Sequence, residues 1–208
     1  VEFSQFMGAE MLARKYGLSK DQLDAYALES HRRAKAATEA GRFGDEVLPV
    51  PTWRQGEDRS GELHTVDEGI RFDASLQGIA GVKLLQEGGV ITAATASQIA
   101  DGAAGVMVAS ERAVKTFGLK PLARIHHLSV VGGDPVVMLV APIPATQAAL
   151  KKAGLKVDDI GAFEVNEAFA PVPLAWLQVT GADPARLNVH GGAIALGHPL
   201  GAAGAKLM

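Results

Sequence analysis

Apolar residues recur at helical spacing in the first part of the chain. The segment 7–17 predicts a helix that Gly17 ends, with four side chains near one face: Met7, Met11, Leu12 and Tyr16. A second helix follows, because Ser19 and Gln22 have the spacing of an N-terminal capping box. Gly41 suits the left-handed position after its last turn. The buried face of this helix is predicted to carry Leu23, Tyr26, Ala27, Ser30 and Ala34.

Later in the chain the pattern alternates between strands and helices. Four segments have the composition of strands: 46–53, 105–110, 122–131 and 159–165, with 105–110 expected to be buried. Helices are predicted over 142–155, entered through proline and left at Gly154, and from Asn166 onward, interrupted by prolines. Polar residues 54–69 predict a surface loop or a small hairpin. This alternation predicts an α/β fold, with helices covering a sheet. The composition changes near residue 85, which is the best candidate for a domain boundary.

Composition narrows the function classes. The 208 residues carry a formal net charge of −3 and no extended basic run, so no nucleic-acid partner is expected. No apolar stretch reaches the roughly 18 residues of a membrane span, and a cytoplasmic setting is the default. Cysteine is absent, which excludes disulfides and thiolate metal sites within these residues. The sequence begins without Met and ends inside an apolar helical pattern, so it is expected to be an excerpt of a longer chain.

Densely placed glycines surround His198 in the segment 188–206. Pro199 suits a first helical position, which would put His198 next to a helix N-terminus. Such a place favours a neutral imidazole and stabilises a nearby oxyanion. The flanking glycines would let a thioester or phosphate approach the main chain. A plain glycine-rich turn is the alternative, whereas the spacings of the Walker and dinucleotide-binding patterns are not met.

A second candidate is the stretch 165–170, where a strand is expected to end at Asn166 and Glu167. Residues at the carboxyl end of a sheet strand are well placed to face a crevice. The alternative is that Asn166 is an ordinary helix cap.

Together these stretches carry a family resemblance. "NEAFA" followed by "NVHGGAIALGHPLGAAGAK" resembles the paired C-terminal signatures of the thiolase family. Residues 21–50 resemble the loop domain of that family, and 91–110 resemble the segment that returns to its N-terminal half. The resemblance implies acyl transfer between a 3-ketoacyl-CoA and CoA, or the reverse Claisen condensation, with an acylated cysteine as nucleophile and a second cysteine as acid and base.

The resemblance also implies roles for particular residues. His198 would activate the nucleophilic cysteine and help to hold the thioester oxygen, and Asn166 would position a water in the same oxyanion site. Ser97 resembles a serine that contacts the pantetheine arm of CoA. Ala93 and Phe169 correspond to further pantetheine positions, and Arg71 to a loop-domain contact with the nucleotide end.

The sequence departs from the family pattern in three places. Neither catalytic cysteine is present, so the 208 residues alone are predicted to be inactive, with the nucleophile expected before Val1 and the second cysteine after Met208. Ala94 and Thr95 stand where the family usually has Gly-Asn, and His190 where it usually has Asn. The alternative to an enzyme is therefore a truncated or degenerate thiolase, a non-catalytic CoA-binding or assembly protein.

The implied architecture is the layered α/β/α thiolase fold, incomplete here. Its expected parts are a partial loop domain over 1–88, a returning segment of the N-terminal half over 89–112, and a truncated C-terminal half over 113–208. CoA is expected as a substrate, without a tightly bound cofactor, and the family implies a homodimer or homotetramer.

No metal site is expected from the histidines. His31 lies among arginines on the second helix and is expected to face solvent. His126 and His127 are neighbours in a predicted strand, where successive side chains point to opposite faces.

Overall fold

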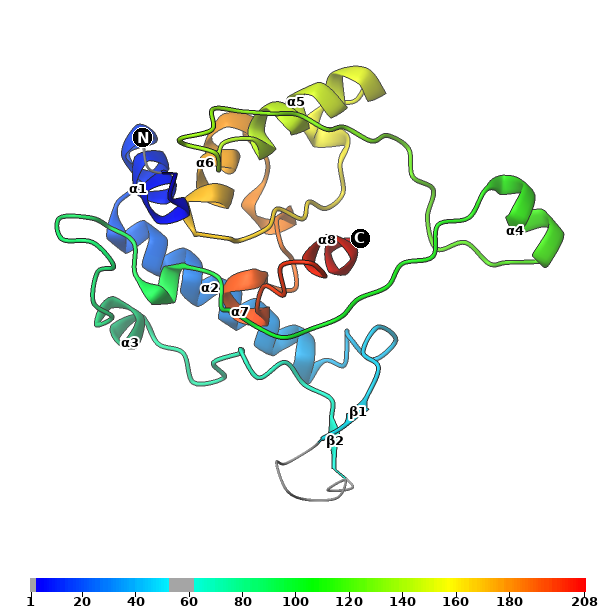
Figure 1. The fold of residues 1–208 in the computed structure, drawn as a ribbon, viewed down its shortest axis with the longest axis horizontal. Helices are drawn as coiled ribbons and strands as arrows, with labels where there is room; N and C mark the ends of the chain where they lie inside the picture. Colours follow the sequence, from blue (N-terminus) through cyan, green and yellow to red (C-terminus); the bar gives the residue numbers. More distant parts are fainter. Residues whose placement is uncertain (1–2, 53–61) are drawn as a thin grey trace.

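The computed structural model describes residues 3–52 and 62–208 (Figure 1). Helices dominate, and η marks a short 3-10 helix. The elements in chain order are α1 (Gln5–Lys15), α2 (Lys20–Glu39), β1 (Val50–Pro51), β2 (Leu63–His64), α3 (Leu76–Ala80), η1 (Ala93–Thr95), α4 (Glu111–Phe117), α5 (Pro142–Ala153), η2 (Val157–Asp159), α6 (Pro171–Thr180), η3 (Pro184–Arg186), α7 (Ala193–Leu196) and α8 (Ala203–Leu207).

Helix α2 confirms the sequence prediction in detail. The Ser19 hydroxyl accepts a hydrogen bond from Gln22 N at 3.3 Å, and the Gln22 side chain accepts from Ser19 N at 2.9 Å. After the last turn, Gly41 is left-handed with φ +66°. The buried residues on α2 include four of the five predicted positions, Leu23, Ala27, Ser30 and Ala34, and Tyr26 is half-buried.

Helix α1 is rotated relative to the prediction. Gly17 does follow its end, with φ +63°. Leu12 is buried as predicted and Tyr16 is half-buried, but Met7 and Met11 are exposed. The buried face consists instead of Gly8, Ala9, Glu10, Leu12 and Ala13, because α1 packs on the core through small side chains.

Helices α5 and α6 both begin at proline, which was predicted for α5, whereas the helix predicted from Asn166 onward begins only at Pro171. Pro142 and Pro171 are the first residues of their helices, where a missing backbone N–H costs nothing. Pro173 also lies in the first turn of α6, so the prolines start this helix rather than interrupting it. The two helices end at left-handed Gly154 and Gly181.

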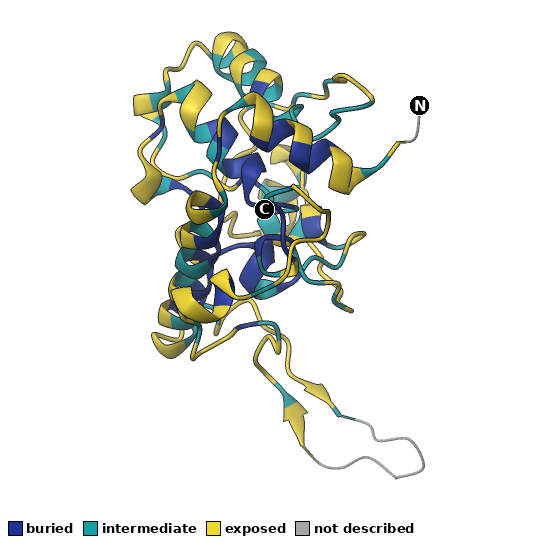
Figure 2. Ribbon diagram, turned by 90° about the vertical axis from the view of Figure 1, so that its left-hand side faces the viewer, coloured by how far each residue is buried: buried dark blue, intermediate teal, exposed yellow. Residues whose placement is uncertain are grey.

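The core lies where α1, α2, α6 and α7 meet, and Figure 2 shows the buried residues gathered between these helices. Leu12, Leu23 and Trp176 are among its largest fully buried side chains. Glu10 on α1 ties in the segment after residue 88, because its carboxylate accepts from Val90 N and Ile91 N, each at 2.9 Å.

A small antiparallel hairpin projects from this core (Figure 2). Val50 pairs with His64, and Pro51 with Leu63. The strand predicted over 46–53 is therefore confirmed only at Val50–Pro51, and the hairpin that it forms takes in Leu63–His64 of the 54–69 segment rather than lying within that segment. The loop that joins the strands, residues 53–61, lies outside the described residues.

Residues 100–133, the extended arm, contradict two strand predictions. The arm leaves the core, carries α4 at its far end and returns (Figure 1). Segment 105–110 is exposed throughout and 122–131 almost throughout, and neither is paired within the described part of the chain. A strand is stable only when its N–H and C=O groups pair with a neighbour, and no described segment provides one here.

The strand predicted over 159–165 is also reduced in the structure. Its pairing among the described residues is a parallel bridge between Phe163 and Leu187.

Within the described ranges, no helix is both long and apolar enough to cross a bilayer.

Candidate functional site

Asn166 and His198 meet, although 32 positions separate them in the sequence. Asn166 Nδ2 lies 3.4 Å from His198 Nε2. Nε2 accepts this hydrogen bond when the neutral ring carries its proton on Nδ1. His198 Nδ1 is itself buried and has no partner among the described residues. The pair therefore presents one polar atom that the described part of the chain does not satisfy.

The backbone around His198 differs from the sequence prediction. Pro199 does not begin a helix, because α8 starts at Ala203. Pro199 instead opens a turn, in which its carbonyl accepts from Ala202 N at 2.8 Å and Ala203 N at 2.9 Å. His198 is held by its own backbone, since its N–H donates to Gln98 O at 2.9 Å.

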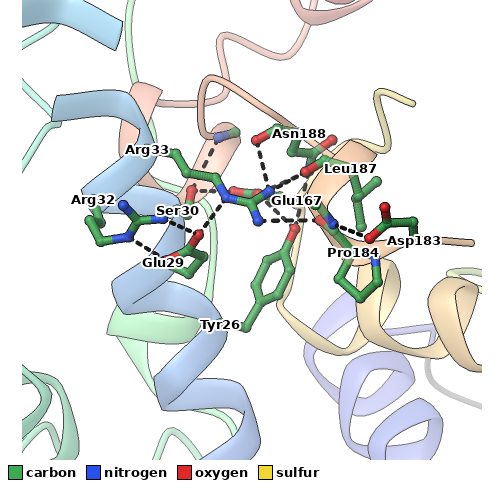
Figure 3. Close-up of polar contacts among 12 residues, drawn as sticks. Tyr26, Glu29, Ser30, Arg32, Arg33, Glu167, Asp183, Pro184, Leu187 and Asn188 are labelled. Carbon is green, nitrogen blue, oxygen red and sulfur yellow. Dashed lines mark hydrogen bonds and ion pairs between the residues drawn. The ribbon is translucent and has the colours of Figure 1, made fainter. Parts of the chain in front are cut away.

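Glu167, next to Asn166, is a fully buried carboxyl group that four donors surround (Figure 3). Oε1 accepts from Tyr26 Oη at 2.8 Å and Asn188 Nδ2 at 2.9 Å. Oε2 accepts from Ser30 Oγ at 2.7 Å and Ile194 N at 3.1 Å. These bonds join α2, the 165–170 loop and the start of α7, so they fix the backbone on both sides of the Asn166–His198 pair.

Asn188 completes this network. Its amide bridges the main chain of Val165, accepting from Val165 N at 2.8 Å and donating to Val165 O at 2.9 Å. Asn188 is 2% exposed and adopts φ +45°, a conformation that asparagine tolerates better than most residues.

The sequence predictions did not include Tyr26, Ser30, Glu167 and Asn188 among the site residues. A signal was present, because a hydroxyl at Ser30 on a predicted buried helix face needs a polar partner.

The glycines before His198 permit close packing within the protein. A Cβ on Gly191 would lie 2.6 Å from Ser30 O, and one on Gly192 would overlap the Glu167 carboxyl. Gly197 has φ +80° and a Cβ there would lie 2.8 Å from the Ala100 Cβ. Gly201 and Gly204, in contrast, have open space around them. Of these five glycines, only Gly201 and Gly204 have free space next to the backbone in which a ligand could lie.

Arg33 fastens the same region from the outer side of α2 (Figure 3). Its guanidinium donates to Leu187 O, and to Pro184 O at 3.2 Å. Its Nε also pairs with Glu29 Oε1 at 2.6 Å. Hydrogen bonding from Arg32, with Arg33 acting in the same direction, lowers the pKa of Glu29 to about 2.

Two further groups titrate abnormally near Glu167. Burial raises the pKa of Tyr26 well above its usual range, and the negative charge of Glu167 acts in the same direction. Partial desolvation, followed by the charge of Glu167, raises the pKa of Glu164 to about 7, although Glu164 is an exposed residue. Shifted carboxyl groups of this kind cluster at functional sites, and Glu164 lies two positions before Asn166.

Of the predicted CoA positions, Phe169 lies in the 165–170 loop of Asn166 and Ser97 is bonded to that loop. Ser97 N donates to Ala168 O at 3.0 Å, and Ala96 bridges to Phe169. The Phe169 ring is 4% exposed and packs edge-on against Phe6, with 5.5 Å between centroids. Ala93 begins η1 and is exposed.

Arg71, the remaining predicted CoA position, lies on a separate loop, and this loop contacts His31. His31 is buried, 6% exposed, and its Nδ1 accepts from Arg71 N at 3.2 Å. Burial, followed by the charge of Arg71, lowers the pKa of His31. His31 therefore does not face solvent; it anchors the loop from which the exposed Arg71 side chain projects.

The two substitutions relative to the family pattern have different surroundings. Thr95 is fully buried, and its hydroxyl accepts from Thr92 N at 3.0 Å, which closes the η1 turn. His190 is exposed, with its ring edge-on to Phe43 at 5.8 Å. Across residues 3–52 and 62–208, no group of three or more His, Cys, Asp or Glu side chains could hold a metal ion.

Two family models match nearly the whole chain. The thiolase N-terminal domain matches residues 2–112, and the thiolase C-terminal domain matches residues 119–208. The chain belongs to the thiolase family. It is 56% identical over 206 residues to the steroid 3-ketoacyl-CoA thiolase FadA6 of Mycobacterium tuberculosis, covering 99% of this chain and 49% of that protein.

Solved thiolase structures share the fold. Human mitochondrial 3-ketoacyl-CoA thiolase in complex with CoA superposes with a TM-score of 0.87 at 41% identity, over 97% of this chain and 49% of that one. The Bacillus anthracis acetyl-CoA acetyltransferase gives a TM-score of 0.91 at 33% identity, over 99% and 52%. The predicted thiolase-type α/β fold is confirmed, and the chain spans about half the length of the curated relatives it matches.

Proposed function

We propose that the full-length protein carrying this chain is a CoA-dependent acyltransferase of the thiolase type. It transfers an acyl group from a 3-ketoacyl-CoA to CoA, or runs the reverse Claisen condensation of acyl-CoA. The observation that carries the proposal is the meeting of Asn166 and His198, with 3.4 Å between their side-chain nitrogens. These are the two residues that the thiolase signatures select for catalysis.

The chemistry explains why such a pair is useful. Attack of sulfur on a carbonyl carbon places negative charge on the carbonyl oxygen, and preorganised donors stabilise that charge by several kcal/mol. His198 activates the sulfur nucleophile and helps to hold the oxygen, while Asn166 positions a water in the same site. His198 Nδ1 has no partner among the described residues, so it is able to bond to a group that lies outside them.

CoA is proposed to lie across the Ser97 and Phe169 region, with its nucleotide end toward Arg71. Ser97 and Phe169 support this placement because both are tied to the loop of Asn166. Ala93, the third predicted pantetheine position, is an exposed small residue at the start of η1. The human mitochondrial 3-ketoacyl-CoA thiolase has been solved as a crystal structure in complex with CoA.

The sulfur nucleophile is not among these residues, since the chain has no cysteine. We therefore expect the 208 residues alone to be inactive. The alternative function is a degenerate thiolase that binds CoA or assembles without catalysis.

The remaining expectations follow from the family. We propose a role in fatty acid degradation, a homodimer or homotetramer, and a cytoplasmic setting. We also propose a loop domain over 1–88, a returning segment over 89–112 and a C-terminal half from 113.

Thiolysis of acetoacetyl-CoA and of a longer 3-ketoacyl-CoA by the purified full-length protein tests the proposal. We expect turnover by the wild type and a loss of at least about a hundredfold in His198→Ala, as for a lost oxyanion donor. The matched control is His190→Ala, an exposed histidine nearby, for which turnover should stay close to wild type. An inactive wild type that binds CoA in calorimetry would favour the non-catalytic alternative, and near-normal turnover in His198→Ala would contradict the assignment.

A further inference from the structure

Gln98 occupies the point where three segments of the site meet. Its backbone carbonyl accepts the hydrogen bond from His198 N at 2.9 Å. Its side-chain amide donates to Ile194 O at 2.8 Å and to Gly69 O at 2.7 Å. One residue therefore contacts the backbone of the catalytic histidine, the helix α7 that precedes it, and the loop that leads to Arg71.

The contact with the Arg71 loop is close and leaves no spare room. A Cβ on Gly69 would lie 2.7 Å from Ala195 O and 3.1 Å from Gln98 Nε2. Only glycine allows this approach without displacement of the backbone. Two positions further on, Arg71 N is bonded to His31 Nδ1 at 3.2 Å, so the loop is fixed at two points.

We propose that Gln98 is a positioning residue that sets the relative placement of His198 and Arg71. The inference rests on the proposed function, because it assigns His198 to the reaction and Arg71 to CoA. The two amide bonds hold the 69–71 loop against α7, and the carbonyl of the same residue holds His198. Loss of the amide donors releases the 69–71 loop from α7, the helix next to His198, and leaves two carbonyl acceptors without a protein donor, while the backbone bond from His198 N remains.

The first test is Gln98→Met in the full-length protein, because methionine keeps the side-chain length and removes the donors. We expect kcat/KM to fall at least about tenfold, with a lower kcat through His198 and a higher KM for CoA through Arg71. The matched control is Gln147→Met, the same replacement at an exposed position on α5, which should behave as wild type. Unchanged kcat and KM in Gln98→Met would overturn the proposal.

A readout independent of activity separates this proposal from the proposed function. Amide hydrogen exchange in Gln98→Met should rise at residues 69–71 and 195–198 and stay unchanged in the middle of α2. If the wild type performs no thiolysis but this exchange pattern is seen, the proposed function fails while the coupling through Gln98 holds. Unchanged exchange at both segments would overturn the coupling even in an active enzyme.

A second variant covers the case in which Gln98→Met does not fold. Gln98→Glu has nearly the same shape, and its carboxyl can donate a hydrogen bond only when protonated. We expect its activity relative to wild type to be lowest at high pH and to recover as the pH falls. A relative activity that is flat across pH would overturn the role of the amide donors, because a merely space-filling side chain gives no such profile.

Discussion

Two regions of this molecule both carry large apolar side chains but have opposite surroundings. In the helical core of α1, α2 and α6, side chains such as Leu12, Leu23 and Trp176 are at most 1% exposed. In the extended arm over 100–133, Met107 is 83% exposed and Leu122 is 101% exposed. The difference lies in the backbone rather than in hydrophobicity.

A helix satisfies its own backbone groups, whereas a strand depends on a neighbour. Helix α2 can therefore form within this chain, because it needs only its capping residues and one packed face. The arm has the residues of buried strands and no described segment beside it. A half-length thiolase chain thus retains its helices and the loops they fix, and leaves the strand-like segments exposed.

Amide hydrogen exchange should differ more between the two regions than any other property. In the 208-residue chain, amides in the middle of α2 should exchange at least about a thousandfold more slowly than those of 104–109, because local opening spans the range up to global stability. Exchange followed by mass spectrometry measures both regions in one sample. Equal rates would contradict the comparison, and protection of 104–109 that grows with protein concentration would show that this segment pairs between copies.

Removal of the Glu167 carboxyl should give the next largest effect. Glu167→Ala removes the acceptor of the Tyr26 and Ser30 hydroxyls and of Ile194 N, and each donor left unsatisfied costs about 1–3 kcal/mol. We expect the free energy of unfolding to fall by more than about 3 kcal/mol in denaturant titrations of the full-length protein.

The matched control for Glu167 lies in the arm. Glu111 on α4 pairs with Lys115 at 2.7 Å, and both side chains are about three quarters exposed. Glu111→Ala should change the stability by less than about 0.5 kcal/mol, since exposed ion pairs contribute little. A larger loss in Glu111→Ala than in Glu167→Ala would reverse the account of the two regions.

A smaller effect is expected from His31, which holds the Arg71 loop. Its pKa is lowered in the folded protein, so the unfolded chain takes up a proton first as the pH falls below about 6.5. The stabilising neutral state is therefore fully present at higher pH and is lost on acidification. His31→Gln should lower the melting temperature more at pH 7.5 than at pH 5.5, and a gap that widens at low pH would contradict this assignment.

Much of the fold could be predicted because helix signals are local. The capping box at Ser19, the proline at 142 and the glycines at 41 and 154 each specify a boundary by the conformation of one or two residues. The failures were of another kind. Strand pairing at 105–110 depends on partners far away in the sequence. The rotation of α1 about its own axis depends on how that helix packs against α6.

From the sequence, the candidate site could be predicted only where its residues lie in recognisable family signatures. Asn166 and His198 stand out because their neighbours match a family pattern. The supporting residues do not, since Gln98 acts through contacts with Gly69 and Ile194 that no spacing along the chain reveals. Ser30 was assigned to a buried helix face, but its partner Glu167 lies 137 positions away.

The central claim is that Asn166 and His198 act as one unit, and a double-mutant cycle on kcat/KM for thiolysis tests it most directly. The full-length protein is compared with Asn166→Ala, His198→Ala and the double variant. Residues that serve one oxyanion are strongly non-additive, so the double variant should lose little more than the more severe single variant. A loss in the double variant equal to the product of the two single losses would contradict the account.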